Sequence, residues 1–217
     1  TTATSVSTGG LCTCAVLSGG TVKCWGYGNS GQLGNGSTSN QSSPVSVDNI
    51  TTATSVSAGD VHTCAVLSGG TVKCWGYGGY GQLGNGSTSN QSTPVTVSNI
   101  DNATSVSAGG NHTCALISGG TIKCWGEGSD GQLGNGATSD QSTPVSVSNI
   151  DNATSVSAGF NHTCAVLSGG TIKCWGDGSF KQLGNGSTSD QNTPVSVSNI
   201  SNATAVSGGE RYTCALI

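Results

Sequence analysis

The chain has 217 residues and a formal net charge of −4, and only 7% of its residues are charged, against about 25% in an average globular protein. Positive charge this sparse argues against a nucleic-acid-binding surface, which needs clustered Lys and Arg. No apolar run approaches the roughly 20 residues of a membrane-spanning helix, so we expect no membrane span.

A fifty-residue unit recurs along the sequence without insertion or deletion. Four full copies span residues 1–50, 51–100, 101–150 and 151–200, and a partial fifth copy covers residues 201–217. No linker or shift in composition separates the copies. Repeats of this kind form one continuous stack rather than tethered domains, so we predict a single repeat domain over residues 1–217.

The third copy illustrates the predicted strands. Residues 103–108 (ATSVSA) alternate small polar and apolar side chains, and residues 112–117 (HTCALI) follow a Gly-Gly pair. A turn at residues 118–120 (SGG) leads to residues 121–126 (TIKCWG), and a Gly-rich stretch then leads to residues 144–148 (PVSVS). These segments are rich in β-branched residues and lack helical spacing, which predicts four short strands. Proline at the start of the fourth segment suits an edge strand.

Four-stranded antiparallel units that recur every 40–50 residues are typical of β-propeller blades. The predicted fold class is therefore all-β, a β-propeller-type array of about four and a third blades with fifty residues in each.

The spacing of the ten cysteines predicts one disulfide in each blade. Cys14 and Cys24 bracket a three-residue turn, so they face each other across a hairpin within disulfide reach. A zinc site would need Cys-x2-4-Cys spacing and a second pair nearby. Disulfides indicate an oxidising, extracellular compartment. The same spacing gives the pairs Cys64–Cys74, Cys114–Cys124 and Cys164–Cys174.

Two cysteines remain outside these pairs. Cys12 stands where the other full copies have histidine, and Cys214 lies in the partial copy, without a cysteine ten residues on. The two could bond to each other, either closing a ring within one chain or joining one molecule to the next. Alternatively, both are unpaired because the sequence is cut from a longer protein.

The string His-Thr-Cys-Ala-x-x-Ser-Gly-Gly-Thr-x-Lys-Cys-Trp-Gly, followed by Gly-Gln-Leu-Gly and Pro-Val, resembles the regulator of chromosome condensation repeat. The resemblance covers the whole chain and implies a β-propeller, usually seven-bladed, that serves mainly as a protein-binding platform. The eukaryotic founder of the family is a nucleotide-exchange factor that docks on chromatin, and a bacterial relative inhibits β-lactamase through its loops. The matching residues of the third copy are His112, Ala115, Trp125, Gly126, Gly131, Gln132, Leu133, Gly134, Pro144 and Val145.

The chain departs from that family in its number of copies, its predicted disulfides and the near-identity of its repeats. These departures indicate a secreted, disulfide-containing variant of bacterial type. We therefore do not transfer the exchange-factor and chromatin roles to this chain.

Three sets of residues resemble chemical sites in composition, and none predicts a cofactor, a metal or an enzyme. The Gly26–Gly31 stretch fits G-x-G-x-x-G, but no helix follows it to hold a pyrophosphate. The recurring histidines have only a threonine beside them, so we expect each to bond backbone or a hydroxyl of the next blade. They are His62, His112 and His162.

The third set is acidic and would suit calcium, which prefers oxygen ligands on loops. The first two copies have uncharged residues at the matching positions, which argues against a calcium site. The acids are Glu127, Asp130, Asp140, Asp177 and Asp190.

Aromatic residues fall into two groups. Trp25, Trp75, Trp125 and Trp175 recur once per copy, which predicts packing against the neighbouring blade rather than exposed stacking on sugars. The others vary between copies, lie in turns and are candidates for exposed contact. They are Tyr27, Tyr77, Tyr80, Phe160 and Phe180.

Asn-x-Ser/Thr sequons are frequent in this Ser- and Thr-rich chain. Those in the Gly-rich loops are candidate glycosylation sites if the host and compartment allow. They start at Asn35, Asn40, Asn85, Asn90 and Asn185.

Two non-enzymatic functions fit these features. The first is an extracellular structural protein that assembles head to tail into a filament through its incomplete terminal blade, since a bare strand edge can be completed by a second molecule. The alternative is a secreted propeller that binds a protein or a glycan.

Overall fold

The computed structural model of the protein describes residues 2–217, and those residues form β-strands and connecting loops without a helix. Four four-stranded antiparallel sheets are followed by one two-stranded sheet, so the chain is an all-β array of four blades and part of a fifth. None of the described segments is a helix long and apolar enough to cross a membrane.

Each sheet is a meander in which neighbouring strands along the chain pair with each other. The first sheet contains β1 (Ala3–Thr8), β2 (Cys12–Leu17), β3 (Val22–Gly26) and β4 (Gln41–Ser46). The second contains β5 (Ala53–Ala58), β6 (His62–Leu67), β7 (Val72–Gly76) and β8 (Gln91–Thr96). The third contains β9 (Ala103–Ala108), β10 (His112–Ile117), β11 (Ile122–Gly126) and β12 (Gln141–Ser146). The fourth contains β13 (Ala153–Ala158), β14 (His162–Leu167), β15 (Ile172–Gly176) and β16 (Gln191–Ser196). The partial sheet contains β17 (Ala205–Gly208) and β18 (Thr213–Leu216).

The hairpin between the second and third strands sets the position of each disulfide. The amide of Leu17 donates to the carbonyl of Thr21 at 2.8 Å, and this turn places Cys14 directly opposite Cys24. One disulfide therefore crosses each four-stranded sheet, as the spacing predicts. The bonds are Cys14–Cys24, Cys64–Cys74, Cys114–Cys124 and Cys164–Cys174.

The fourth strand differs from the prediction at its start. The sequence predicts a strand that opens at proline, but β12 begins at Gln141 and holds Pro144 in its interior. The register between Cys124 and Gly126 is irregular, which lets the strand extend past a residue without an N–H group. A proline is tolerated there because this strand is the outer edge of its sheet.

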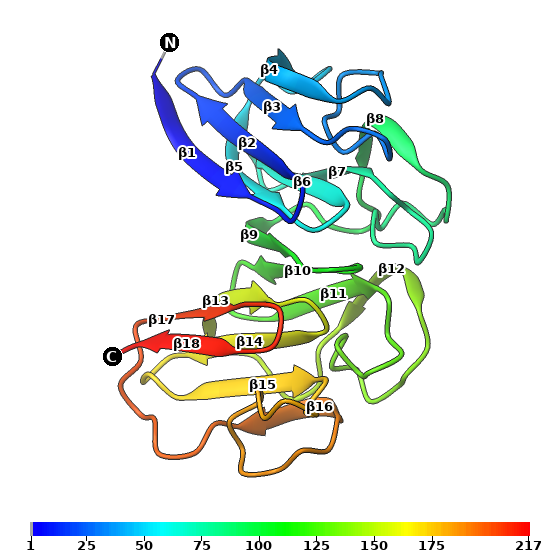
Figure 1. The fold of residues 1–217 in the computed structure, drawn as a ribbon. Coiled ribbons are helices and arrows are strands. Elements are labelled where there is room, and N and C mark those ends of the chain that lie inside the picture. The colour runs from blue at the N-terminus through cyan, green and yellow to red at the C-terminus, as the bar shows by residue number, and fades with distance from the viewer. Residues whose placement is uncertain (1) are drawn as a thin grey trace.

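The blades follow one another around a common centre, as Figure 1 shows for the open arc from β1 to β18. The first strand of each sheet is the inner one, since β1, β5, β9, β13 and β17 contact one another in succession. The inner strands are also joined by side chains. The hydroxyl of Ser57 accepts a hydrogen bond from the amide of Ala108 at 3.0 Å, and the other sheets repeat this bond.

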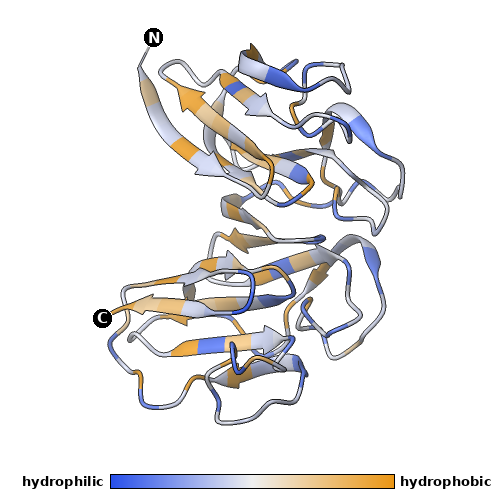
Figure 2. Ribbon diagram, viewed as in Figure 1, coloured by the Kyte–Doolittle hydropathy of each residue, from blue (hydrophilic) through white to orange (hydrophobic). Residues whose placement is uncertain are grey.

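Apolar side chains from successive sheets share a core. Leu83 and Val97 of the second copy pack in one cluster with Trp125 and Ala115 of the third, and all four are buried. In Figure 2 the hydrophobic colour lies mainly along the strands, while the long loops between third and fourth strands are mostly pale or blue. Each blade thus depends on its neighbour for burial, as in other repeat proteins.

Candidate interaction face

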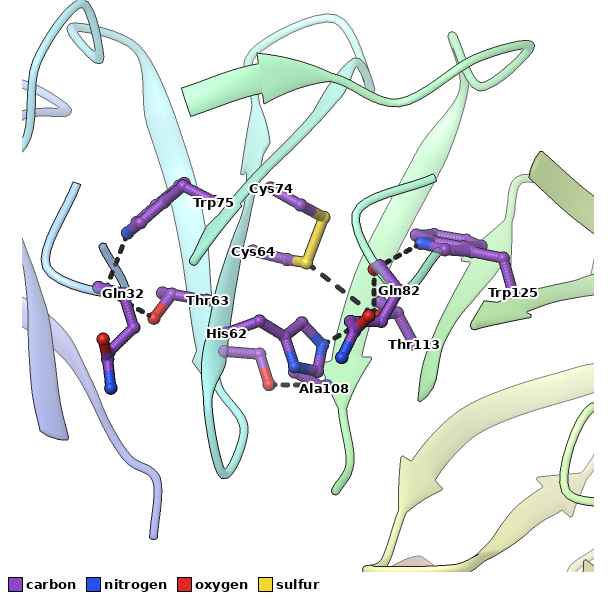
Figure 3. Close-up of a disulfide and its surroundings, with 11 residues drawn as sticks. Gln32, His62, Thr63, Cys64, Cys74, Trp75, Gln82, Ala108, Thr113 and Trp125 are labelled. Carbon is purple, nitrogen blue, oxygen red and sulfur yellow. Dashed lines mark hydrogen bonds between the residues drawn. A yellow bond between two sulfur atoms is a disulfide. The ribbon is translucent and has the colours of Figure 1, made fainter. Parts of the chain in front are cut away.

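Successive blades are joined by one repeated set of hydrogen bonds, which we call the joint. In the joint drawn in Figure 3, the carbonyl of Gln82 accepts from the Trp125 indole nitrogen at 2.8 Å and from the Thr113 hydroxyl at 2.9 Å. His62 of the second copy lies 2.8 Å from the same Thr113 hydroxyl. The prediction that each histidine bonds a hydroxyl of the next blade is confirmed, and His112 and His162 repeat it at Thr163 and Thr213.

The joint fixes the protonation of its histidine. Because the single proton of the Thr113 hydroxyl goes to the Gln82 carbonyl, the Nε2 atom of His62 must carry hydrogen and donate. Its Nδ1 atom is buried without a partner. Burial lowers the pKa of His62 and of His162 to about 4, and burial together with the two neighbouring histidines lowers the pKa of His112 to about 3. These residues are neutral parts of the scaffold at pH 7.

Acid is expected to destabilise the fold through these histidines. Since their folded pKa values lie below the unfolded value near 6.5, the unfolded chain binds more protons, and stability falls as the pH drops from about 6.5 towards 4. For His62 the loss approaches about 3 kcal/mol by pH 4. Urea unfolding between pH 7 and pH 4 measures it.

His112→Gln is the matched control for this prediction. Glutamine keeps an N–H donor for Thr163 and does not titrate. The variant should show a shallower loss of stability on acidification than the wild-type chain, and parallel pH profiles would contradict the assignment.

The first and last copies lack parts of the joint within residues 2–217. Trp25 is half-buried, whereas Trp75, Trp125 and Trp175 are fully buried against the preceding blade. The expected packing against a neighbouring blade is therefore confirmed for the last three tryptophans. Cys12 replaces the histidine of the joint, and its thiol lies buried 4.0 Å from the Thr63 hydroxyl.

Cys12 and Cys214 are both free thiols among the described residues. Cys12 is buried, and burial raises its pKa, whereas Cys214 is exposed. A bond between them requires the Cys12 thiol to leave its place beside Thr63. The Cys12–Cys214 disulfide stays a prediction.

The aromatic residues that vary between copies and most of the acidic residues lie at one end of the blades. In a four-stranded meander the loop after the first strand and the loop after the third strand share one end, and the Tyr27 amide joins them by donating to the Leu11 carbonyl at 2.9 Å. We call this end the loop face. It comprises residues 9–11, 27–32 and 38–40 and their equivalents in the other copies.

Two hollows open between loops of this face. The larger, of about 290 Å³, is lined by the last residues of the inner strands and the glycines that follow them, together with Asp60, Phe160 and Glu210. The other, of about 230 Å³, lies between the third and fourth blades and is lined by Asp130, Asp190 and three uncharged polar residues. Both hollows contain residues that differ between copies.

The acidic residues of the third and fourth copies lie near one another on the loop face. No three His, Cys, Asp or Glu side chains of residues 2–217 gather as a metal ion would require. Burial raises the pKa of Asp130, and the negative charges of Asp190, Asp177 and Glu127 raise it further. The loops therefore hold like charges near one another across two blades.

Other candidates from the sequence have local roles in the loops. Gly26 is in the left-handed region (φ +112°), and a Cβ atom there would lie 2.7 Å from the Leu11 carbonyl, so this glycine of the G-x-G-x-x-G pattern serves a tight turn. Two of the candidate glycosylation residues, Asn40 and Asn90, accept hydrogen bonds from the amides of Gly28 and Gly78 through Oδ1. Their side-chain amide nitrogens take no part in these bonds. Asn35, Asn85 and Asn185 cap their own turns in the same way, and all five sequons stay predictions.

Solved structures share this fold. The chain is similar to Prp20p from Saccharomyces cerevisiae (TM-score 0.88, 21% identity, 98% of this chain and 55% of that one), whose structure was described with its binding properties to Gsp1p and histones. It is also similar to human WBSCR16 (TM-score 0.89, 23% identity, 99% and 57%). The ectodomain of the Physcomitrella patens receptor kinase CR4 matches less closely (TM-score 0.60, 23% identity, 99% and 47%). The chain thus spans about half the length of these structures.

The comparison with curated proteins gave no match. The family profile described as "Regulator of chromosome condensation (RCC1) repeat" matches residues 19–66, 69–116, 120–166 and 170–216, and a second profile of the same description matches residues 53–82, 103–132 and 153–182. Each match of the first profile begins near the turn after a second strand and ends in the next blade, so a family repeat spans two neighbouring blades. With these matches covering most of its length, the chain belongs to the RCC1 repeat family.

Proposed function

We propose that the protein is a non-enzymatic interaction module that binds a protein partner through its loop face. One observation carries this proposal: the four full copies keep the glutamine, threonine and tryptophan of the joint and exchange residues of the loops. The amides of Ser30, Tyr80, Asp130 and Phe180 all donate to a glutamine Oε1 two residues on, at 2.9–3.0 Å, although the four side chains differ completely. A rigid frame that presents exchangeable side chains is typical of repeat proteins that bind partners.

An extracellular location belongs to the same proposal. Four disulfides within one chain are compatible with an oxidising compartment and are rare in reducing ones. The similarity to the ectodomain of a receptor kinase is a likeness of fold and agrees with an extracellular module.

Binding to an array of secreted proteins tests the function. The wild-type chain is compared with a variant in which Tyr80→Ser, Phe160→Gly and Phe180→Ser remove three exposed aromatic side chains. Ser30 and Gly110 occupy the matching positions in other copies. Circular dichroism checks that the variant is folded. We expect the wild-type chain to bind a partner and the variant to lose that binding at least tenfold. Equal binding by both would contradict the proposal, and binding only to a parallel glycan array would favour a glycan ligand instead.

Head-to-tail self-assembly is a second candidate, supported by complementary surfaces at the two ends of the described chain. Gly34, Gly84 and Gly134 each adjoin a tryptophan of the next blade, whereas the matching Gly184 lies in a cavity of about 280 Å³ lined by Ile172, Val197 and Ile200. Trp25, at the other end, is half-buried. A Trp25 side chain from a second molecule has the size and the N–H donor that the three internal joints use.

Sedimentation of the 217-residue chain over a range of concentrations tests self-assembly, and electron microscopy shows whether filaments form. Wild-type chains are expected to associate and Trp25→Ser chains to remain monomeric. Non-reducing electrophoresis then shows whether Cys12 and Cys214 contribute an intermolecular bond. A wild-type chain that stays monomeric at all concentrations would overturn this candidate.

A further inference from the structure

Five of the six tyrosine and phenylalanine residues of the chain lie on the loop face, and the sixth, Tyr212, directly follows its residues 209–211. The chain has four Tyr and two Phe, and none is found in a strand or at the opposite end of a blade. Several are well exposed, among them Phe160 at 40% and Phe180 at 53%. They are Tyr27, Tyr77, Tyr80, Phe160, Phe180 and Tyr212.

Charge is also distributed unequally between the two ends. Asp48, Asp101 and Asp151 lie at the opposite end, whereas all the other acidic residues lie on the loop face. The loop face also carries Lys181 and Arg211, and Arg211 lies over the Phe180 ring and beside Glu210. Its acids are Asp60, Glu127, Asp130, Asp140, Asp177, Asp190 and Glu210.

The fold does not need these side chains. The amide of Gly28 donates to Asn40 at 2.9 Å, and the amide of Gly128 donates to Asp140 at 3.0 Å, so an amide caps the loop as well as a carboxylate does. At residue 30 of the repeat the copies carry Ser, Tyr, Asp and Phe on the same backbone hydrogen bond.

The arrangement also has a cost for the free chain. Exposed aromatic rings leave apolar surface in water, and Asp130 lies part-buried among three other acids. Aromatic residues are enriched in the central contacts of protein–protein interfaces. A cation placed beside Asp130 and Asp190, which line one hollow, would offset the repulsion between the acids.

Resting on the interaction function proposed above, we infer that the partner is a protein with a basic surface. Tyr80, Phe160 and Phe180 supply the apolar contacts, and the acids of the third and fourth blades receive Lys and Arg side chains of the partner. Long-range attraction to this face also speeds the encounter, so binding weakens as salt is added.

Two triple variants with the same change in net charge test the inference. The loop-face variant carries Asp130→Ser, Asp140→Asn and Asp190→Asn, which remove three negative charges and introduce residues that other copies carry at the same positions. Asp48→Ser, Asp101→Thr and Asp151→Thr do the same at the opposite end. The probes are lysozyme and cytochrome c, two small basic proteins, with the acidic α-lactalbumin for comparison, and affinity is measured by interferometry at low and high salt.

We expect the wild-type chain to bind the basic probes and not α-lactalbumin. The loop-face variant should lose at least tenfold in affinity, and the opposite-end variant should stay within twofold of wild type. Equal losses of affinity in both variants would mean that binding depends on net charge alone, and this would overturn the inference. Equal binding of basic and acidic probes would also overturn it. If the array partner requires the loops but is acidic or neutral, this inference fails while the interaction function stands.

Discussion

Replacing Trp125 with alanine is expected to lower the free energy of unfolding by about 3–5 kcal/mol, the usual cost of removing a large buried aromatic side chain. The indole is fully buried, and it donates to the Gln82 carbonyl at 2.8 Å. A Cβ atom on Gly84 would lie 2.7 Å from the indole nitrogen, so the third blade fits closely against the second. Urea unfolding followed by circular dichroism measures the loss.

The chain provides its own control for this experiment. Trp25 occupies the same place in the repeat but is half-buried, with no blade before it in residues 2–217. Trp25→Ala should cost less than about 1.5 kcal/mol. If the two variants were equally destabilised, the cost would come from within one blade and the joint would not be the main stabilising contact.

Reduction of the four disulfides is expected to have a comparable or larger effect. Each bond closes a loop of about ten residues and stabilises the fold by roughly 2–3 kcal/mol through the entropy of the unfolded chain. A domain of this kind is stable by only about 5–15 kcal/mol in total. Treatment with a reductant should therefore unfold the chain or lower its melting temperature sharply, as circular dichroism would show.

The double variant Cys114→Ala, Cys124→Ala isolates one bond. Both cysteines are fully buried and lie opposite each other in the third sheet. This double variant should lose about a quarter of the stability that full reduction removes, apart from the cost of the cavity left by the two sulfur atoms. A melting temperature that does not change on reduction would show that packing between blades is sufficient.

Local patterns predicted the strands and the disulfides because both depend on residues close in sequence. Cys14 and Cys24 are ten residues apart, and a three-residue turn is enough to pair them. The start of β12 was mispredicted because proline usually interrupts pairing, and only the irregular register at Gly126 shows how Gln141 joins the strand ahead of Pro144.

The joint was only partly predictable. One histidine per copy indicated a bond to the next blade, but the acceptor for Trp125 is a backbone carbonyl, which no sequence pattern specifies. The loop face was not predicted as one surface either. Its residues come from two loops of each copy, and their common position follows from the order of strands in the sheet.

The polarity of the joint bears on how such a chain changes in length. The two complete joints, between the second and third and the third and fourth copies, run in the same direction, with a histidine donating forward to a threonine and an indole donating back to a glutamine carbonyl. Duplication or deletion of one whole fifty-residue unit therefore reconnects the same donors to the same acceptors. Such recombination would lengthen or shorten the arc by one blade and alter the set of loop residues displayed, while each contact between neighbours is preserved.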